Sequence, residues 1–264
     1  MGYARGAVRL SQPSTIPFLL VLARALLLLL VLAAPRLAFA KGNETAGPPV
    51  MLEVPGQAPA YFYPPRTKGA KKPLIVWLHG RGGNPERDCQ KWAKVATEIG
   101  FILCPSGPEN RGGGARGWHN SWPGAKRSVD AAVAAFMATK HGKRVKSGAN
   151  ILIGFSEGAL VAMNVGVREP EVFARWLILA ANDVYWGMEG VNELKKNKKR
   201  IKRVYLLTGE KDGVVENTRR VFGSIDKESV KVRMWTPEDI GHEVPEDRMR
   251  TFYRRPLRWL AAAR

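Results

Sequence analysis

The sequence has few acidic residues, few cysteines and few histidines. It holds 23 Asp and Glu against 42 Lys and Arg, a formal net charge of +19 at pH 7, with 2 Cys and 4 His in 264 residues. It also lacks a basic helix-turn-helix, a zinc finger and an RNA-binding signature, which argues against nucleic acid as the partner of this positive charge. No internal repeat is present, and the 45% hydrophobic and 25% charged residues are typical of one globular domain.

The first forty residues are predicted to be a secretory signal peptide. Residues 1–9 are basic, residues 25–34 form an unbroken apolar run, and residues 38–40 supply an A-x-A cleavage site. The alternative is a retained membrane anchor, because the apolar region approaches the roughly 20 residues of a membrane span when it is read across Arg24. We therefore expect an exported protein, periplasmic or extracellular. No lipid anchor is expected, because no Cys follows the cleavage site.

Much of the remaining positive charge lies in one run of the chain. Without the four arginines of residues 1–40, the net charge is +15. The run consists of Lys195, Lys196, Lys198, Lys199, Arg200, Lys202 and Arg203. Such a run is usually a solvated face, and its alternative role is long-range attraction of anionic envelope polymers or acidic substrates.

The two cysteines, Cys89 and Cys104, leave two alternatives open. Cys89 falls near the start of an expected helix and Cys104 at the end of the next expected strand, so a right-handed α/β unit places both at one edge of the sheet. Export would permit a disulfide there, closing a loop of about 15 residues and contributing about 3 kcal/mol. The other alternative is a pair of buried thiols. Neither cysteine has the surroundings of a catalytic residue.

Apolar runs that alternate with helix-forming segments predict an α/β fold. The expected strands are residues 50–54, 60–63, 74–78, 101–104, 150–153, 176–180, 204–208 and 230–235. The expected helices are residues 85–99, 128–141, 157–169, 215–222 and 246–263, with a long loop over 105–124 and an insertion over 182–199. This order predicts a three-layer α/β/α sandwich with a mostly parallel sheet and no separate cap domain. Residues 41–69 are expected to form an N-terminal linker and an edge hairpin, and residues 70–264 the main domain.

The segment Gly154-Phe155-Ser156-Glu157-Gly158 follows an apolar strand and opens a helix. It matches G-x-S-x-G, in which a tight strand-to-helix turn exposes the serine hydroxyl above the sheet. The two glycines lack Cβ atoms, so neighbouring backbone can pack against a strained turn. The helix also directs free N–H groups and its positive dipole end toward an oxyanion beside Ser156. The pentapeptide alone is weak evidence, so the prediction of a nucleophile depends on its surroundings.

A serine hydroxyl needs a base, and His242 is the expected one. It lies between the last expected strand and the last expected helix, in a loop at the same carboxyl edge of the sheet as Ser156. The other histidines fit structural positions better. His79 is expected to brace a loop, His119 lies in a flexible aromatic loop, and His141 lies at a helix C-terminus.

Asp212 is the expected carboxylate that orients the imidazole of His242. It follows the expected strand 204–208 and reaches the same edge. The rival carboxylates are Asp183, Glu210 and Asp239. The order Ser156, Asp212, His242 is the nucleophile–acid–base order of the α/β-hydrolase fold.

The oxyanion hole is expected to take one backbone N–H from Glu157 and one from Arg81. Arg81 lies in a glycine-rich segment after the expected strand 74–78, where small residues let the backbone approach a substrate. The alternative is that these glycines only form a turn. Aromatic residues on neighbouring loops are candidates for substrate binding or, equally, for anchoring the loops in the core. They are Trp118, Trp122, Tyr185 and Trp186.

Taken together, these segments resemble an α/β-hydrolase of the phospholipase/carboxylesterase branch, which includes acyl-protein thioesterases and is related to dienelactone hydrolases. The matching motifs are Leu-His-Gly-Arg-Gly-Gly, Gly-Phe-Ser-Glu-Gly-Ala, Thr-Gly-Glu-Lys-Asp and Gly-His-Glu, from about residue 70 to the end. The resemblance implies a compact serine hydrolase that uses no metal or cofactor and acts on esters or thioesters, with residues 70–264 as its catalytic domain. Three features depart from the family. It often has Gln where Glu157 stands, dienelactone hydrolases have Cys where Ser156 stands, and the signal peptide and basic run are untypical of cytosolic thioesterases.

The sequence therefore predicts a secreted carboxylesterase with a Ser-Asp-His triad and an acyl-enzyme intermediate. Its substrate would be a small-molecule or polymeric ester, and its state a monomer or homodimer. One alternative is a serine peptidase on the same fold. The other is a non-catalytic module of this fold that binds anionic envelope polymers through its basic run.

Overall fold

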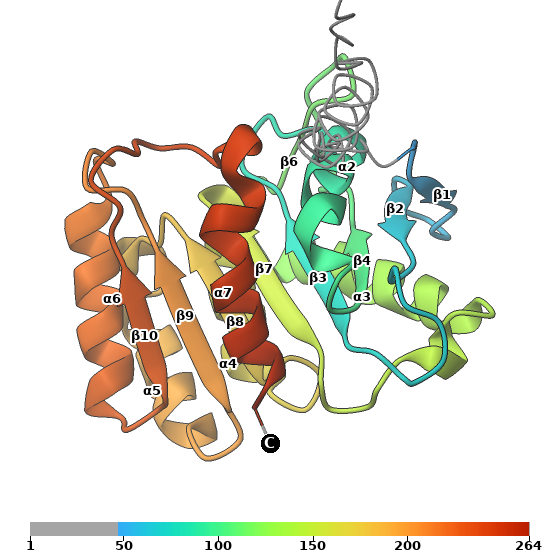
Figure 1. The fold of residues 1–264 in the computed structure, drawn as a ribbon. Coiled ribbons are helices and arrows are strands. Elements are labelled where there is room, and N and C mark those ends of the chain that lie inside the picture. Colours follow the sequence, from blue (N-terminus) through green and yellow to red (C-terminus); the bar gives the residue numbers. More distant parts are fainter. Residues whose placement is uncertain (1–46, 264) are drawn as a thin grey trace, which may run out of the picture. The chain divides into compact units, whose positions relative to one another are not determined.

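The chain folds around one eight-stranded sheet. The computed structural model describes residues 47–263, so the expected signal peptide lies outside the described residues. The strand order is β1-β2-β4-β3-β7-β8-β9-β10 (Figure 1). The strands are β1 (Val50–Leu52), β2 (Ala60–Tyr63), β3 (Leu74–Leu78), β4 (Phe101–Cys104), β7 (Ile151–Phe155), β8 (Arg175–Leu179), β9 (Arg203–Leu207) and β10 (Val232–Trp235). From β4 to β10 every neighbouring pair is parallel, and β1 and β2 form an antiparallel hairpin at the edge beside β4.

Helices cover both faces of the sheet. On one face lie α3 (Trp122–Ala138), α4 (Glu157–Arg168), α5 (Gly187–Asn197) and α6 (Val215–Lys227), and on the other α2 (Pro85–Ala96) and α7 (Met249–Ala261). The strand β3 shows why both faces are apolar. Its Leu74, Val76 and Leu78 pack in one core cluster and its Ile75 and Trp77 in the other, because successive side chains of a strand point to opposite faces. The expected three-layer α/β/α sandwich with a mostly parallel sheet is confirmed.

Helix ends follow the local sequence. The Asn84 side chain accepts a hydrogen bond from the Arg87 amide and caps α2, with Pro85 in the first turn. The helix α3 begins at Trp122, six residues before the expected start at residue 128. Ser121 is its N-cap residue and a proline lies in its first turn, a start signal that the sequence analysis assigned to the loop.

The segment between β4 and α3, expected as a long loop over 105–124, also contains regular structure. It carries a two-stranded antiparallel ribbon, β5 (Glu109–Asn110) and β6 (Arg116–Gly117).

The two cysteines form a disulfide, with Cα atoms 5.7 Å apart, that ties Cys89 of α2 to Cys104 at the end of β4. Of the two alternatives, a disulfide or a pair of buried thiols, the structure contains the disulfide. Within residues 47–263, no helix combines the length and apolar character that crossing a membrane requires.

Candidate active site

Ser156 occupies the turn between β7 and α4 with an unusual backbone conformation. Its φ of 53° and ψ of −117° lie outside the regions that L-residues normally adopt. The packing around the turn leaves no room for side chains at its two glycines. A Cβ on Gly158 would lie 2.2 Å from the Leu78 carbonyl oxygen, and one on Gly154 would lie 2.3 Å from the Gly158 carbonyl oxygen. The G-x-S-x-G spacing thus reflects close backbone contact between β3, β7 and α4.

Three side chains from three different loops meet at the carboxyl edge of the sheet. The Ser156 Oγ lies 2.9 Å from His242 Nε2, and His242 Nδ1 lies 2.9 Å from Asp212 Oδ2 and 3.1 Å from Oδ1. Because a carboxylate only accepts, Nδ1–H donates to Asp212, and this tautomer leaves the Nε2 lone pair facing the serine hydroxyl. Asp212 is buried, and its Oδ1 also accepts from the Val214 amide at 3.0 Å. The arrangement can remove a proton from Ser156 and hold the resulting imidazolium.

The rival carboxylates are all engaged elsewhere. Asp183 accepts from Arg220 at 2.8 Å and from Asn217 at 2.8 Å, and the Arg220 guanidinium lowers the pKa of the Asp183 carboxyl. Glu210 pairs with Arg219 at 2.7 Å, and Asp239 pairs with Arg248. Among the carboxylates that the sequence analysis considered, Asp212 alone contacts His242.

The glycine-rich segment after β3 lies against the serine turn. A Cβ on Gly80 would lie 3.5 Å from the Ser156 Cβ, which places the Gly80–Arg81 peptide beside the nucleophile. Within residues 47–263, neither the Arg81 nor the Glu157 backbone amide donates to a protein acceptor. Both amides are therefore available to donate to an oxyanion. Their catalytic use stays a prediction.

The Glu157 side chain has a position that the sequence analysis missed. It is buried directly behind the nucleophile, and its two oxygens accept from the amides of Trp118 at 3.1 Å and Asn120 at 2.8 Å. Arg81 lies 3.6 Å from the same carboxylate. One carboxylate thus holds the loop before α3 and the side chain of the second oxyanion-hole candidate. The only signal for this role in the sequence was an acidic residue at a position where the family that the sequence resembles often has Gln.

His79 braces the same loop from the other side. Its Nδ1–H donates to the Gly80 carbonyl at 2.8 Å, its Nε2 accepts from the Gly107 amide at 3.1 Å, and its ring stacks on Trp118 with centroids 4.8 Å apart. The Trp118 Nε1 donates to the His79 carbonyl at 2.8 Å. Burial lowers the pKa of His79, so the ring stays neutral and keeps both hydrogen bonds.

The four aromatic candidates for substrate binding do not share one role. Trp118 is 0% exposed and Trp186 4% exposed, so of the two alternatives for these side chains burial favours the anchoring of loops in the core. Trp122 is half-buried under the Arg168 guanidinium, 4.0 Å from the ring centroid. Tyr185 is 53% exposed. For Trp122 and Tyr185 a role in substrate binding stays a prediction, and neither lines the cavity described next.

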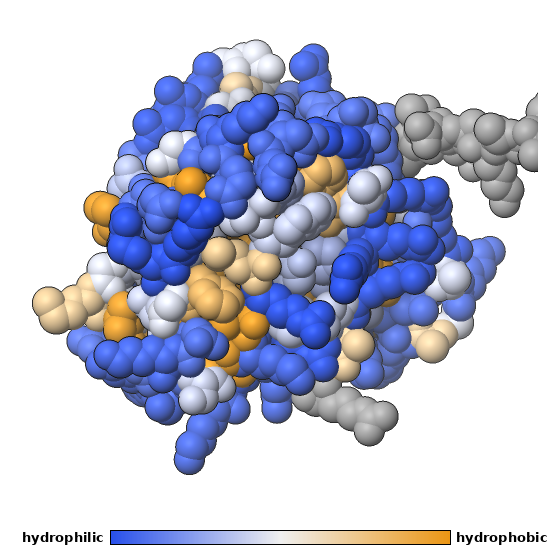
Figure 2. Space-filling view, turned by 60° about the vertical axis from the view of Figure 1, so that its left-hand side comes forward, coloured by the Kyte–Doolittle hydropathy of each residue, from blue (hydrophilic) through white to orange (hydrophobic). Residues whose placement is uncertain are grey.

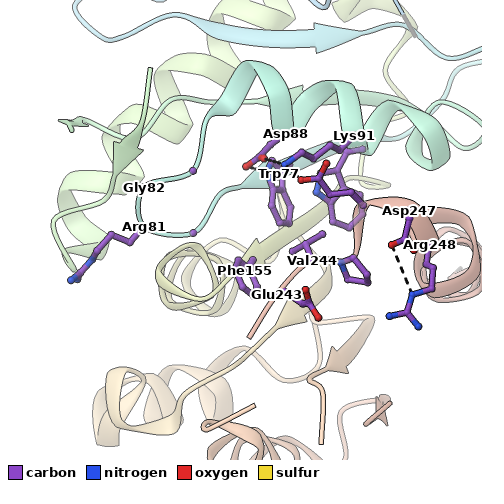
Figure 3. Close-up of a pocket in the computed structure, with 15 residues that line it drawn as sticks. Trp77, Arg81, Gly82, Asp88, Lys91, Phe155, Glu243, Val244, Asp247 and Arg248 are labelled. Carbon is purple, nitrogen blue, oxygen red and sulfur yellow. Dashed lines mark hydrogen bonds and ion pairs between the residues drawn. The ribbon is translucent and has the colours of Figure 1, made fainter. Parts of the chain in front are cut away.

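A cavity of about 460 Å³ adjoins the serine turn. Residues 80–83, α2 and the segment 243–248 after His242 line it, with Trp77 and Phe155 among them (Figure 3). Its charged lining residues are Arg81, Asp88, Lys91, Glu243, Glu246, Asp247 and Arg248. In Figure 3 the Arg81 side chain extends away from the other labelled residues. The lining is therefore mostly polar, and several of its charges pair with one another, Lys91 with Asp88 and Glu246, and Arg248 with Asp247.

Within residues 47–263, no group of three or more His, Cys, Asp and Glu side chains could hold a metal ion.

Neither a protein-family model nor a curated protein matches the chain. Solved structures with the same fold include a carboxylesterase from Bacillus cereus (TM-score 0.54, 16% identity, covering 76% of this chain and 92% of that one). Esterase PE8 has a TM-score of 0.57 at 22% identity over 80% of this chain and all of its own. The dipeptidyl peptidase 4 of Porphyromonas gingivalis has a TM-score of 0.58 at 17% identity, over 81% of this chain and 35% of the peptidase. At these identities the likeness establishes the α/β-hydrolase fold.

Proposed function

We propose that this protein is a serine hydrolase that cleaves carboxylic esters through a Ser156–His242–Asp212 triad. The observation that carries the proposal is the continuous set of hydrogen bonds from Asp212 through His242 to the Ser156 hydroxyl, on a strained strand-to-helix turn. The esterases among the proteins of similar fold support the same reaction class.

In this mechanism His242 takes the Ser156 proton as the hydroxyl oxygen attacks the ester carbonyl carbon. The tetrahedral oxyanion accepts hydrogen bonds from the Arg81 and Glu157 amides, and Asp212 stabilises the imidazolium. His242 then gives its proton to the leaving alcohol as the C–O bond breaks, which leaves an acyl group on Ser156. Water, deprotonated by the same imidazole, attacks the acyl carbon, and the carboxylic acid leaves as Ser156 regains its proton.

The polar cavity beside Ser156 favours esters with a short or polar acyl or alcohol part over long aliphatic chains, because a hydrocarbon bound there would displace water from the exposed and half-buried carboxylates and cations of the lining. The same chemistry would also cleave thioesters. We place the reaction outside the cytoplasm, in the periplasm or beyond the cell. Residues 1–40 fit an export signal, and disulfides such as Cys89–Cys104 persist in oxidising compartments.

The test is a substrate panel run with wild type and Ser156→Ala. It contains short-acyl, long-acyl and feruloyl esters, a soluble polyester, a thioester and matched p-nitroanilides of dipeptides. We expect ester turnover by the wild type, strongest for short or polar substrates, and a loss of at least about a thousand-fold in Ser156→Ala with unchanged thermal unfolding. Full ester turnover by the folded variant would refute the proposal. A kcat/KM that is higher for the dipeptide anilides than for the esters would favour a peptidase.

A further inference from the structure

A cluster of arginines lines a groove between α7 and the edge strand β10. The groove has a volume of about 560 Å³. Its charged residues are Arg233 of β10 and Arg250, Arg254, Arg255 and Arg258 of α7, with Trp259 and Thr251 beside them. We call this set the arginine groove. It shares no lining residue with the cavity beside Ser156.

The helix and the strand each turn their polar side outward here. In α7, Phe252, Tyr253 and Leu257 are buried in the core, so the opposite side of the helix carries the arginines. In β10, Arg233 is exposed between the half-buried Val232 and Met234. Arg250, Arg254 and Arg258 follow one another at helical spacing, about 6 Å apart along the axis. The guanidinium groups therefore form a row rather than a single point of charge.

The positive charge of the groove is only partly balanced within the protein. Arg250 and Arg254 share Glu98, each with an N–O distance of 3.0 Å. Within residues 47–263, Arg233, Arg255 and Arg258 form no ion pair with a carboxylate. Neighbouring like charges repel, so an anion that binds between them would gain both direct pairing and relief of that repulsion.

The Trp259 ring contacts one arginine of the groove, Arg233, and one arginine outside it, Arg203. The Arg233 guanidinium lies 4.8 Å and the Arg203 guanidinium 4.9 Å from its ring centroid. Arg203 also donates to the Trp259 carbonyl. Cation–π contact holds two guanidinium groups in place, which reduces the side-chain entropy that binding would otherwise cost. The same contacts occupy the indole ring, so it is not free to stack on a nucleobase.

We propose that the arginine groove is a docking site for an acidic polysaccharide, a linear chain that carries a carboxylate on successive sugars. The planar guanidinium forms two parallel hydrogen bonds to a carboxylate, and a concave row of them suits a linear polymer better than a flat bilayer. Single-stranded nucleic acid would use the aromatic ring that the arginines already cover. The lining of the groove is mostly guanidinium groups, unlike the apolar centre of a protein–protein interface. Hydrophilic residues cover most of the face that brings α6 and β10 forward, around smaller apolar areas (Figure 2). The proposal concerns binding and does not depend on ester hydrolysis.

The experiment measures the affinity of the full-length chain for polygalacturonate at several salt concentrations. Three variants are compared with wild type: Arg233, Arg255 and Arg258 all changed to Gln; the same three changed to Lys; and, as a charge-matched control, Lys195, Lys196 and Lys199 all changed to Gln. The controls for folding are the thermal unfolding temperature and turnover of a small ester, which should match wild type in every variant.

We expect the arginine-to-Gln variant to bind at least ten-fold more weakly at low salt and to lose about two from the slope of log K against log salt. The arginine-to-Lys variant should keep the salt dependence but bind about three-fold more weakly, because a lysine cannot pair in the same forked geometry. The lysine control should stay within about two-fold of wild type. Equal losses in the lysine control and the arginine-to-Gln variant would overturn the proposal, since the net charge alone would then explain binding. Tighter binding of polyphosphate, duplex DNA or anionic vesicles than of polygalacturonate, lost in the same arginine variant, would overturn the assignment of the ligand.

Discussion

The two sides of the nucleophile are held in place by different means. On one side, Ser156 follows β7, Asp212 follows β9 and His242 follows β10. These strands are parallel, so their carboxyl ends lie at one edge of the sheet, and this brings the three side chains together. On the other side, the loop before α3 reaches the site through one buried carboxylate, that of Glu157, and one buried imidazole, that of His79. The first arrangement is set by topology, and the second depends on individual side chains. Substitutions on the first side should therefore lower turnover, and substitutions on the second side should lower the stability of the protein as well.

The largest effect is expected from Asp212→Asn, which disrupts the sheet-edge side alone. The amide cannot fix the Nδ1–H tautomer of His242 or balance the imidazolium, so kcat should fall by about 10⁴, equivalent to about 5 kcal/mol of transition-state stabilisation. The measurement is the turnover of a short-acyl ester, with thermal unfolding as the check on folding. Asp183→Asn is the matched control, because Asp183 pairs with Arg220 instead. Equal losses in both variants would contradict the assignment of Asp212.

This side of the site could be predicted from the sequence, and the reason is topological. Ser156, Asp212 and His242 each follow an expected strand, and the carboxyl ends of parallel strands meet at one edge. The expected strands themselves were recognisable from unbroken apolar runs such as 74–78, which both faces of the sheet bury.

The loop side could not be predicted in the same way. The hydrogen bonds from Trp118 and Asn120 to Glu157 join residues 37 to 39 positions apart in the chain. No periodicity or turn signal encodes such a contact, because an irregular loop has no repeating geometry. For the same reason the sequence left Trp118 open between the active-site rim and the core, and it placed the start of α3 six residues too late.

The next largest effect should come from Glu157→Ala, which disrupts the loop side while the triad stays intact. The change leaves a buried and a half-buried amide without acceptors, which should cost about 4 kcal/mol of unfolding free energy. Displacement of the loop and of Arg81 should also lower kcat/KM about ten- to a hundred-fold. Urea unfolding and ester kinetics measure the two effects.

Glu157→Gln sharpens this test. Gln keeps one acceptor oxygen for one of the two loop amides and removes the charge beside Arg81, so both losses should lie between those of wild type and Glu157→Ala. If Glu157→Gln loses as much as Glu157→Ala, the charge rather than the hydrogen bonds holds the loop.

A smaller effect, on stability alone, is expected from the Cys89–Cys104 disulfide. The bridge ties α2 to β4 across a separation of 15 residues, and its removal should lower the unfolding free energy by about 3 kcal/mol and Tm by roughly 6–12 °C. The double variant Cys89→Ser/Cys104→Ser measures this change, and reduction of the wild type should reproduce it. Ester turnover at 25 °C should stay within about two-fold of wild type, since neither cysteine lines the cavity beside Ser156. A large loss of turnover in the folded double variant would mean that the bridge also positions the site.

The smallest effect should appear as a pH dependence that separates the two sides of the site. Burial lowers the pKa of His79 below its ordinary value of 6.5. As the pH falls below 6.5, His79 therefore becomes protonated in the unfolded chain while it is still neutral in the folded chain. The contribution of His79 is therefore fully present above pH 6.5 and is lost as the pH falls, and the unfolding free energy should decrease between pH 7 and pH 5. In His79→Gln the unfolding free energy should be lower at pH 7 but should decrease less over this range. His119→Gln, which removes a histidine with a 59% exposed side chain, is the control and should follow wild type. An identical decrease in wild type and His79→Gln would mean that a neutral His79 imidazole does not cause the pH dependence of the unfolding free energy.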